Sequence, residues 1–246
     1  MVKYSIVMTS YNCEETIELC LASLTEQLDE KYEIIIVDNY STDNTLEKLT
    51  EWSKNSMISI IQAKSSRGLG RHIGVEMAKG EYIISQLDCD EEFKPILQKI
   101  TTIYESRFSD ILLTFNKDEK IMFFVAPRKL LSQVGNYRDL NYHEDRDLYW
   151  RCHQIGKFGY YGNTEYLVQK HQRGKKFSWR VLKRIYHSSI DSFRMGDLPP
   201  HLKKIKIWSP LIWVSIPIFY ILSKLEIQFD NDNGIKKFKE IQHKVN

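Results

Sequence analysis

Apolar runs of strand length alternate with helical patterns over the first ninety residues. The strand-like runs, rich in Ile, Val and Tyr, are residues 4–8, 32–37, 58–62 and 82–87. Between them, apolar side chains recur at helical spacing over residues 17–28, 42–53 and 71–79. The second strand ends in four consecutive apolar residues, which is typical of a strand covered on both faces. This order predicts an α/β fold with a mostly parallel central sheet.

Local signals set the expected ends of two of these helices. Asn12, with Glu15 three residues later, is predicted to cap the first helix. The third helix is expected to begin at Arg71 and to end at Gly80.

The second half of the chain is less regular. Its expected helices are residues 95–107, a short helix that Pro127 opens and Gly135 ends, and residues 144–154. Its expected strands are residues 111–115, 121–125 and one within 159–170. Residues 136–143 are polar and aromatic, and we expect them to form a loop over the site.

The C-terminal part differs in character. Residues 207–223 form a stretch of 17 residues without a charge, flanked by Lys203, Lys204, Lys206 and Lys224. Trp208 and Trp213 suit a membrane interface, and two prolines interrupt the stretch. We therefore expect residues 203–224 to bind a membrane surface as a hairpin or interfacial helix. A helix docked on the core is the alternative. The expected division is a domain of residues 1–185 and a basic, apolar helical segment of residues 186–246.

Composition and charge agree with a folded chain that meets an anionic surface. The chain has 246 residues, 42% of them hydrophobic, and this excludes collagen-like and wholly disordered classes. Lys and Arg exceed Asp and Glu by 16 to 6 over residues 170–246, whereas over residues 1–169 they number 19 against 26. The four scattered cysteines favour a reduced compartment, and the N-terminus does not resemble a signal peptide. We expect a cytoplasmic protein, peripheral on the inner face of the cell membrane.

Carboxylates follow two of the predicted strands. Asp38 ends the second strand, where it could accept hydrogen bonds from a nucleotide base or ribose. Asp88 and Asp90 follow the fourth strand, one residue apart. In open α/β sheets this edge binds ligands, and two such carboxylates can hold a hard divalent cation that bridges to phosphates.

The glycines at 68, 70 and 74 fit neither the dinucleotide fingerprint nor a P-loop. We interpret them as letting a helix begin close to a nucleotide, with Arg71 near its phosphates or base.

Acidic residues open the predicted helix at 144–154. Asp145 follows the expected loop and is well placed to act as a base, whereas Asp147 and Arg151 are spaced to pair along the helix. His171, followed by Arg173 and further basic residues, could face a diphosphate or a metal.

Four segments in this order resemble the family 2 glycosyltransferases of the GT-A fold, over about residues 3–185. They read SIVMTSYN, IIIVDNYSTDNT, RGLGRHIGVEMAKGEYIISQLDCDE and HEDRDLYWR. The block MFFVAPRKLLSQVGNY is similar to the family's segment before the acceptor-side acid. His72 departs from the family pattern, which usually has Asn there, so no role is inferred for that position. The family's Q-x-x-R-W motif of processive synthases is absent from the sequence, which favours transfer of a single sugar.

The resemblance implies a role for each matching residue. Those expected to bind the nucleotide sugar are Thr9, Tyr11, Asn12, Asp38, Gly68, Arg71 and Asp88. Asp90 would bind Mn²⁺ or Mg²⁺, with His171 nearby, and Asp145 of the Glu144–Asp145 pair would be the general base. Glu144 and Arg173 are secondary candidates.

The resulting hypothesis is an inverting transferase that moves one sugar from a nucleotide-diphosphate sugar, with a UDP-sugar favoured, to a hydroxyl of a glycan or lipid-linked acceptor. One alternative is a polyprenyl-phosphate glycosyltransferase, whose anionic acceptor needs no base. Another is a catalytically silent module that binds nucleotide sugar. A nucleotidyltransferase fits the HEDRDLYWR motif and the C-terminal segment of residues 186–246 less well. Nucleic-acid binding is not expected, because the basic tail is apolar and rich in Trp.

Overall fold

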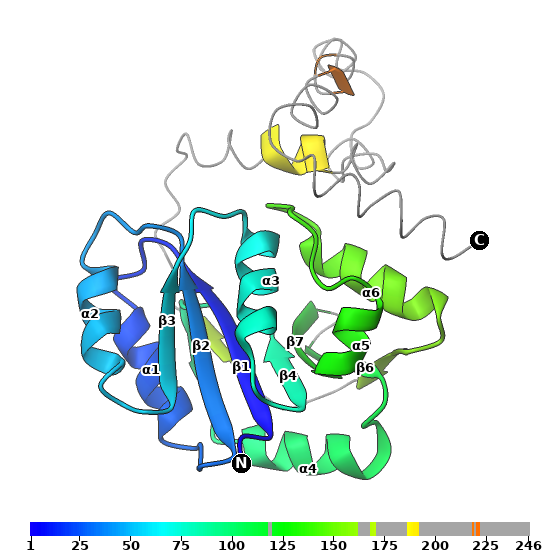
Figure 1. The fold of residues 1–246 in the computed structure, drawn as a ribbon, viewed down its shortest axis with the longest axis horizontal. Helices are drawn as coiled ribbons and strands as arrows, with labels where there is room; N and C mark the ends of the chain where they lie inside the picture. Colours follow the sequence, from blue (N-terminus) through cyan, green and yellow to red (C-terminus); the bar gives the residue numbers. More distant parts are fainter. Residues whose placement is uncertain (118–119, 162–167, 171–185, 192–217, 219, 222–246) are drawn as a thin grey trace.

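A seven-stranded sheet organises the chain (Figure 1). The computed structural model describes residues 1–117, 120–161, 168–170, 186–191, 218 and 220–221. The strands, in spatial order, are β3 (Ile58–Gln62), β2 (Tyr32–Asp38), β1 (Tyr4–Ser10), β4 (Tyr82–Ser85), β7 (Lys120–Pro127), β6 (Leu112–Lys117) and β8 (Phe158–Tyr161). Every neighbouring pair is parallel except the two that β7 forms, with β4 and with β6. The prediction of a mostly parallel sheet is confirmed.

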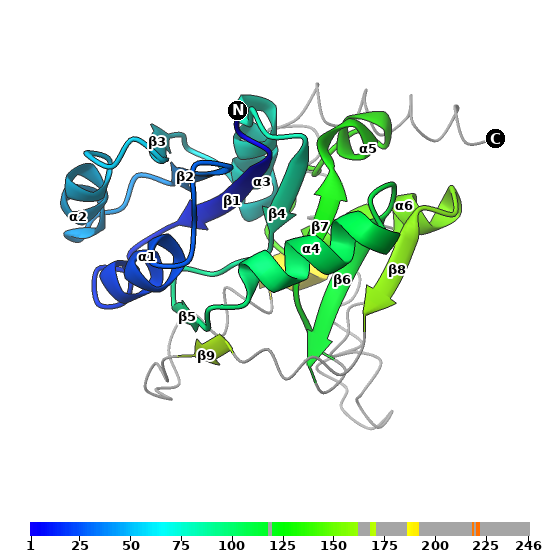
Figure 2. The ribbon, with the colours of Figure 1, turned by 90° about the horizontal axis from the view of Figure 1, so that it is seen from below.

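Helices cover both faces of this sheet (Figure 2). They are α1 (Ile17–Thr25), α2 (Thr45–Trp52), α3 (Arg67–Met77), α4 (Leu97–Arg107), α5 (Arg128–Gln133) and α6 (Glu144–Gln154). Residues of α1, α2 and α4 share one buried cluster, and residues of α3, α5 and α6 share the other.

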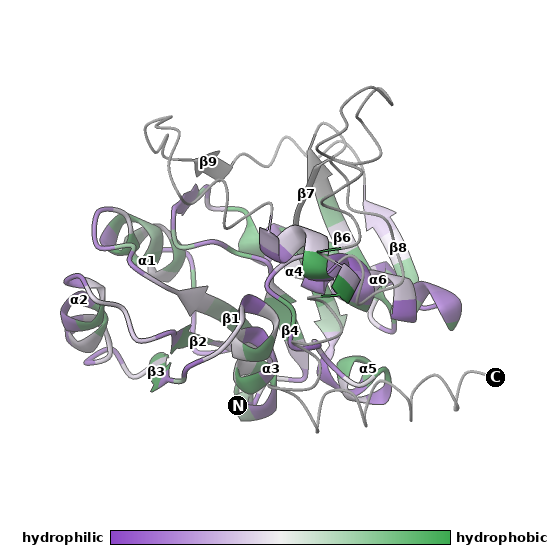
Figure 3. Cartoon of the chain, turned by 90° about the horizontal axis from the view of Figure 1, so that it is seen from above, coloured by the Kyte–Doolittle hydropathy of each residue, from purple (hydrophilic) through white to green (hydrophobic). Residues whose placement is uncertain are grey.

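The alternation of side chains along the strands produces these two layers. In β1, Ile6 and Met8 belong to the first cluster and Val7 to the second. In β2, Ile34 and Ile36 alternate with Ile35 in the same way. Hydrophobic and hydrophilic residues both occur along α1 and α2 (Figure 3), as expected for helices that cover a sheet with one side only.

Two predicted helix starts were wrong. The helix α1 begins at Ile17 after Thr16, not after Asn12, whose backbone is left-handed with φ 48°. The helix α3 begins at Arg67, four residues before the expected start, because the Ser66 hydroxyl accepts a hydrogen bond from the Leu69 N–H at 3.0 Å.

A small second sheet was not predicted. It pairs β5 (Glu91–Phe93) with β9 (Val168–Lys170), antiparallel. The single strand expected within residues 159–170 is therefore two strands, β8 and β9, in different sheets.

Residues 186–191 are helical, and the rest of the predicted membrane segment is mostly outside the described residues. Of residues 203–224, only 218, 220 and 221 are described. Within the described part of the chain, no helix combines the length and the apolar character that crossing a bilayer requires. The predicted boundary at residues 185–186 stays a prediction.

Candidate functional site

The carboxyl ends of β1, β2 and β4 bring most of the predicted site residues to one edge of the sheet. Thr9 is the next-to-last residue of β1, and Asp38 is the final residue of β2. Asp88 and Asp90 lie in the segment between β4 and β5. Because neighbouring parallel strands end at the same edge, residues separated by up to eighty positions in the sequence meet there.

Asp38 is the hydrogen-bonding centre of this edge. Its carboxylate is fully buried and accepts hydrogen bonds from the Ser10 hydroxyl at 2.9 Å and from Gln62 Nε2 at 3.4 Å. It also accepts from the N–H and the hydroxyl of Ser41, at 3.0 and 2.5 Å. Asp38 thus links the ends of β1 and β3 to the loop after β2, and its predicted contact with a nucleotide stays a prediction.

The loops after β1 and β2 support each other beside Asp38. Asn12 donates its backbone N–H to the Ser41 hydroxyl at 3.0 Å and accepts the Thr42 N–H at 2.8 Å. Asp43 accepts the Thr45 N–H at 3.0 Å, at the first residue of α2. Tyr11 is 57% exposed at the rim of this region. A ligand could therefore reach the Tyr11 ring directly.

In the motif of residues 88–90, the central residue is buried and the two outer ones are not. Cys89 is buried, and its thiol donates to the Thr9 carbonyl at 3.2 Å. Asp88 and Asp90 are both partly exposed. The Asp88 N–H also donates to Glu91 Oε2 at 3.3 Å. The thiol anchors the turn to β1 and leaves both carboxylates accessible.

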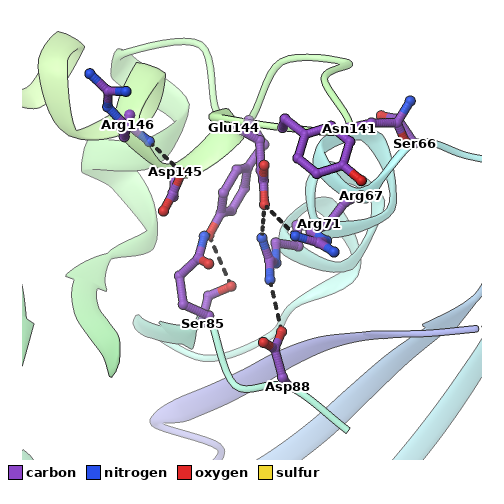
Figure 4. Close-up of polar contacts among 12 residues, drawn as sticks. Ser66, Arg67, Arg71, Ser85, Asp88, Asn141, Glu144, Asp145 and Arg146 are labelled. Carbon is purple, nitrogen blue, oxygen red and sulfur yellow. Dashed lines mark hydrogen bonds and ion pairs between the residues drawn. The ribbon is translucent and has the colours of Figure 1, made fainter. Parts of the chain in front are cut away.

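Arg71 connects this motif to α6. Its guanidinium is fully buried between the Glu144 carboxylate, with which it forms a close ion pair, and Asp88 Oδ1 at 3.5 Å (Figure 4). Burial is the largest single influence and lowers the pKa of Arg71, but Glu144, Tyr137 and Asp88 together outweigh it and the net pKa is raised. Arg71 therefore stays charged. For Glu144, burial raises the pKa, and Arg71 offsets only part of that shift.

Arg67 is a site residue that the sequence analysis missed. Its guanidinium lies 3.9 Å from Glu144 Oε1 and 5.9 Å from the centre of the Tyr142 ring. The signal was the spacing of Arg67 and Arg71, which places both on one side of a helix once the helix begins at Arg67.

The predicted base, Asp145, lies in the first turn of α6 beside Glu144 (Figure 4). It is partly exposed, and its Oδ1 accepts the Arg146 N–H at 2.8 Å. The partial positive charge of the helix N-terminus favours a carboxylate here.

The pair predicted further along α6 is confirmed. Asp147 and Arg151 form a buried ion pair at 2.7 Å, and Arg138 donates to the other oxygen of Asp147 at 2.7 Å. Burial lowers the pKa of Arg138 to about 10, despite the charge of Asp147. Asp147 thus joins α6 to the loop that precedes it.

That loop, residues 136–143, rests on the first turns of α3. The Gly68 N–H donates to the Leu140 carbonyl at 2.8 Å, and His72 Nδ1 lies 2.9 Å from the Tyr137 carbonyl. A Cβ at Gly68 would lie 2.0 Å from the Arg138 carbonyl oxygen. Gly68 therefore makes room for the loop, and its predicted contact with a nucleotide stays a prediction.

The described residues fit a metal ion only in part. Asp88 and Asp90 offer hard carboxylate oxygens, and Mg²⁺ is commonly held by one or two carboxylates together with substrate phosphates. Within the described ranges, no group of three or more His, Cys, Asp or Glu side chains could hold an ion by itself. His171 and Arg173 lie outside the described residues. The donor set suits an ion shared with a diphosphate.

A sequence model of glycosyl transferase family 2 matches residues 5–163 of the chain. The match includes every predicted site residue except His171 and Arg173.

Two curated relatives are bacterial glucosyltransferases. A poly(ribitol-phosphate) beta-glucosyltransferase of Bacillus spizizenii is 42% identical over 88 residues, which are 33% of this chain and 14% of that protein. The Escherichia coli UDP-Glc:alpha-D-GlcNAc-diphosphoundecaprenol beta-1,3-glucosyltransferase WfgD is 29% identical over 133 residues, 51% of this chain and 52% of that protein. The chain thus matches only part of each relative's length.

Among solved structures, Staphylococcus aureus TarS 1–349 in complex with UDP-GlcNAc has a similar fold. The TM-score is 0.65 at 17% sequence identity, and the alignment covers 95% of this chain and 75% of that one.

Proposed function

Because the chain belongs to glycosyl transferase family 2 and has the GT-A fold, we propose that it transfers one sugar from a nucleotide-diphosphate sugar to an acceptor hydroxyl, with inversion. One observation carries this proposal. Arg71 touches both Asp88, on the side of the sheet edge, and Glu144, next to Asp145. The chain thereby has a nucleotide-side motif and a candidate base joined through one buried cation.

A UDP-sugar is the donor that we favour. UDP-GlcNAc is bound in the TarS structure, and UDP-Glc is the donor that the name of WfgD states. In this chain, the exposed Tyr11 ring and the partly exposed Thr9 and Asn12 border the edge where a nucleotide would bind.

The chemistry requires a base on the acceptor and neutralisation of the leaving group. We assign the first task to Asp145, which would take the proton from the acceptor hydroxyl as its oxygen attacks the anomeric carbon. Asp90, with Asp88, would hold Mn²⁺ or Mg²⁺, and such an ion offsets the negative charge that develops on a diphosphate. One in-line displacement needs no covalent intermediate, so the configuration of the sugar carbon inverts.

A glycan or a lipid-linked glycan is the acceptor class that we propose. The names of the two relatives state acceptors of a poly(ribitol-phosphate) and of a sugar diphosphoundecaprenol. The lysines and tryptophans of residues 203–224 support a location on the inner, cytoplasmic face of the membrane, where such acceptors could be reached. The described side chains in this segment, at Ile218, Tyr220 and Ile221, are 50–56% exposed.

The test is a donor screen with purified protein. UDP-, GDP- and dTDP-sugars are incubated with Mn²⁺ or Mg²⁺, with and without membrane lipid extract, and released nucleotide is measured. We expect metal-dependent release from one donor, increased by the extract. Release from no donor would contradict the proposal, and nucleotide binding by calorimetry without any release would support the silent module.

The same assay tests the base. We expect Asp145→Asn to lower turnover by about 10²–10⁴-fold, because general-base help of this size is lost, while donor affinity stays within about twofold. Asp110→Asn is the matched control, since it neutralises an exposed carboxylate paired with Lys157 far from the site. Unchanged turnover in Asp145→Asn would remove Asp145 from this role and favour a phosphate acceptor, which needs no base.

A further inference from the structure

A short helical segment, C-terminal to the expected domain of residues 1–185, contacts the loop that leads to Asp145. Residues 186–191 are helical and lie beyond residues 5–163, the part that the family model matches. Four contacts join this segment to residues 141–143, which immediately precede α6.

The strongest of these contacts come from Asp191. Its carboxylate is 2% exposed, and Oδ2 accepts the backbone N–H groups of Asn141 and Tyr142, both at 2.9 Å. Hydrogen bonds to an ionised acceptor are about twice as strong as neutral ones. Both amides lie within four residues of Asp145, so Asp191 restrains the backbone just before the candidate base.

The Tyr142 side chain is held from two sides. Its ring stacks on His187, with the ring centres 6.5 Å apart and the planes inclined by 18°. The Arg67 guanidinium lies 5.9 Å from the centre of the same ring. Tyr142 therefore connects α3 to the segment of residues 186–191.

His143 connects the residues that Asp191 holds to the first turn of α6. It is the N-cap of α6 and has a left-handed backbone, with φ 64° and ψ 15°. A non-glycine residue in this conformation persists only where its surroundings hold it. His143 Nε2 lies 3.4 Å from the Ser188 hydroxyl, and the two Asp191 hydrogen bonds fix the residues just before it.

From these contacts we infer that Asp191 is a positioning residue for the transfer reaction: residues 186–191 hold the end of the loop 136–143, at residues 141–143, and thereby set the position of Asp145. The inference rests on the proposed function, because Asp145 must be the base for its position to matter. It assigns a catalytic consequence to the first residues of the C-terminal segment 186–246.

Two measurements on the full-length chain test the clamp and the positioning separately. The first is hydrogen–deuterium exchange over residues 138–146. Asp191→Asn should speed exchange of the Asn141 and Tyr142 amides by roughly tenfold, because a neutral amide is a weaker acceptor than a carboxylate. The second is steady-state kinetics, in which kcat should fall about tenfold while KM for the donor stays within about twofold.

Glu33→Gln is the matched control for Asp191→Asn. Glu33 is also a buried carboxylate that accepts a backbone N–H, from Lys79 at 2.7 Å, but it lies at the opposite end of the sheet. This variant should change neither the exchange of residues 138–146 nor kcat. His187→Ala provides a second test that leaves the buried Asp191 carboxylate in place. Like Asp191→Asn, it should lower kcat.

The combined variant with Asp145→Asn separates positioning from general destabilisation. If Asp191 acts through Asp145, adding Asp191→Asn should cause no further loss of kcat. Unchanged exchange in Asp191→Asn would overturn the clamp, and faster exchange with unchanged kcat would overturn the positioning role. A wild-type chain that transfers no sugar would overturn the proposed function, and with it the positioning role, while exchange would still decide whether the clamp exists.

Discussion

At the scale of single residues, Arg71 has the most demanding environment in the site. A fully buried guanidinium requires compensating charge, and Glu144 and Asp88 supply it. Glu144 is itself almost fully buried, so each member of this pair depends on the other. The pair therefore fixes the distance between α3 and the first turn of α6, with Asp88 attached to it.

Replacing Arg71 by Met should both destabilise the protein and weaken donor binding. Removing one partner of a buried ion pair costs about 3–5 kcal/mol, which corresponds to a fall in Tm of roughly 10 °C for a chain of this size. Donor affinity, measured by calorimetry below the new Tm, should fall about tenfold or more, because Asp88 loses its charged partner.

Arg151→Met is the matched control for this variant. Arg151 is also buried in an ion pair, with Asp147, but it does not contact Asp88. We expect a similar loss of Tm and an unchanged donor affinity. Equal donor affinity in both variants would show that Arg71 acts on stability alone.

At the scale of elements, the decisive contact is between α3 and the loop of residues 136–143. Tertiary packing brings the backbones so close that Gly68 has no room for a side chain. The glycines at 70 and 74 serve the same purpose on β1, where an added Cβ would lie 2.9 Å from Thr9 Cγ2 and 2.5 Å from Val7 Cγ1. The glycine pattern that had suggested a nucleotide thus lets α3 pack against its own sheet and loop.

Gly68→Ala should push the loop away from α3. The Arg138 carbonyl oxygen cannot accommodate a Cβ at 2.0 Å, so we expect the free energy of unfolding to fall by about 1–3 kcal/mol, as for overpacked sites. We also expect a lower free energy of local opening for residues 136–143. Denaturant unfolding gives the first quantity, and amide exchange of the loop gives the second.

Gly156→Ala is the control for backbone strain. Gly156 has φ +68°, so alanine there is strained, but its Cβ would meet no atom within 4 Å. It should lower stability by about 1 kcal/mol and leave exchange of residues 136–143 unchanged. If Gly68→Ala left that exchange unchanged too, close packing at Gly68 would not be what seats the loop.

At the scale of the whole molecule, the charge is divided along the chain. Residues 170–246 carry 16 basic and 6 acidic side chains, whereas residues 1–169 carry 19 basic and 26 acidic ones. An anionic surface would attract residues 170–246 and repel residues 1–169. This division orients the molecule on a membrane if residues 203–224 bind there, as we propose.

Vesicle flotation tests this orientation. Replacing the lysines at 203, 204 and 206 by serine should weaken partition onto vesicles containing anionic lipid by about 100-fold, since each contributes about 1 kcal/mol near the surface. Replacing the same three lysines by arginine keeps the charge and should preserve binding. If the serine variant floated as well as the wild type, these lysines would not mediate attachment.

The order of strands and helices could be predicted from the sequence alone, because it depends on local periodicity. Apolar residues spaced by two or by three to four positions report which side of a strand or helix is buried, wherever that element lies. The position of Asp38, Asp88 and Asp90 at one edge was predictable for a related reason, since parallel connections return each strand in the same direction. The pairing of Asp147 with Arg151 is likewise a property of one helical turn.

Only the tertiary structure decided which distant residues stabilise one another. Arg71 and Glu144 are 73 positions apart, and Asp191 is 50 positions from Asn141, so no local pattern links them. The same holds for the antiparallel direction of β7, for the pairing of β5 with β9 and for the backbone that fills the space beside Gly68. Burial makes these charges and close contacts mutually dependent, and burial is a property of the assembled layers rather than of any one segment.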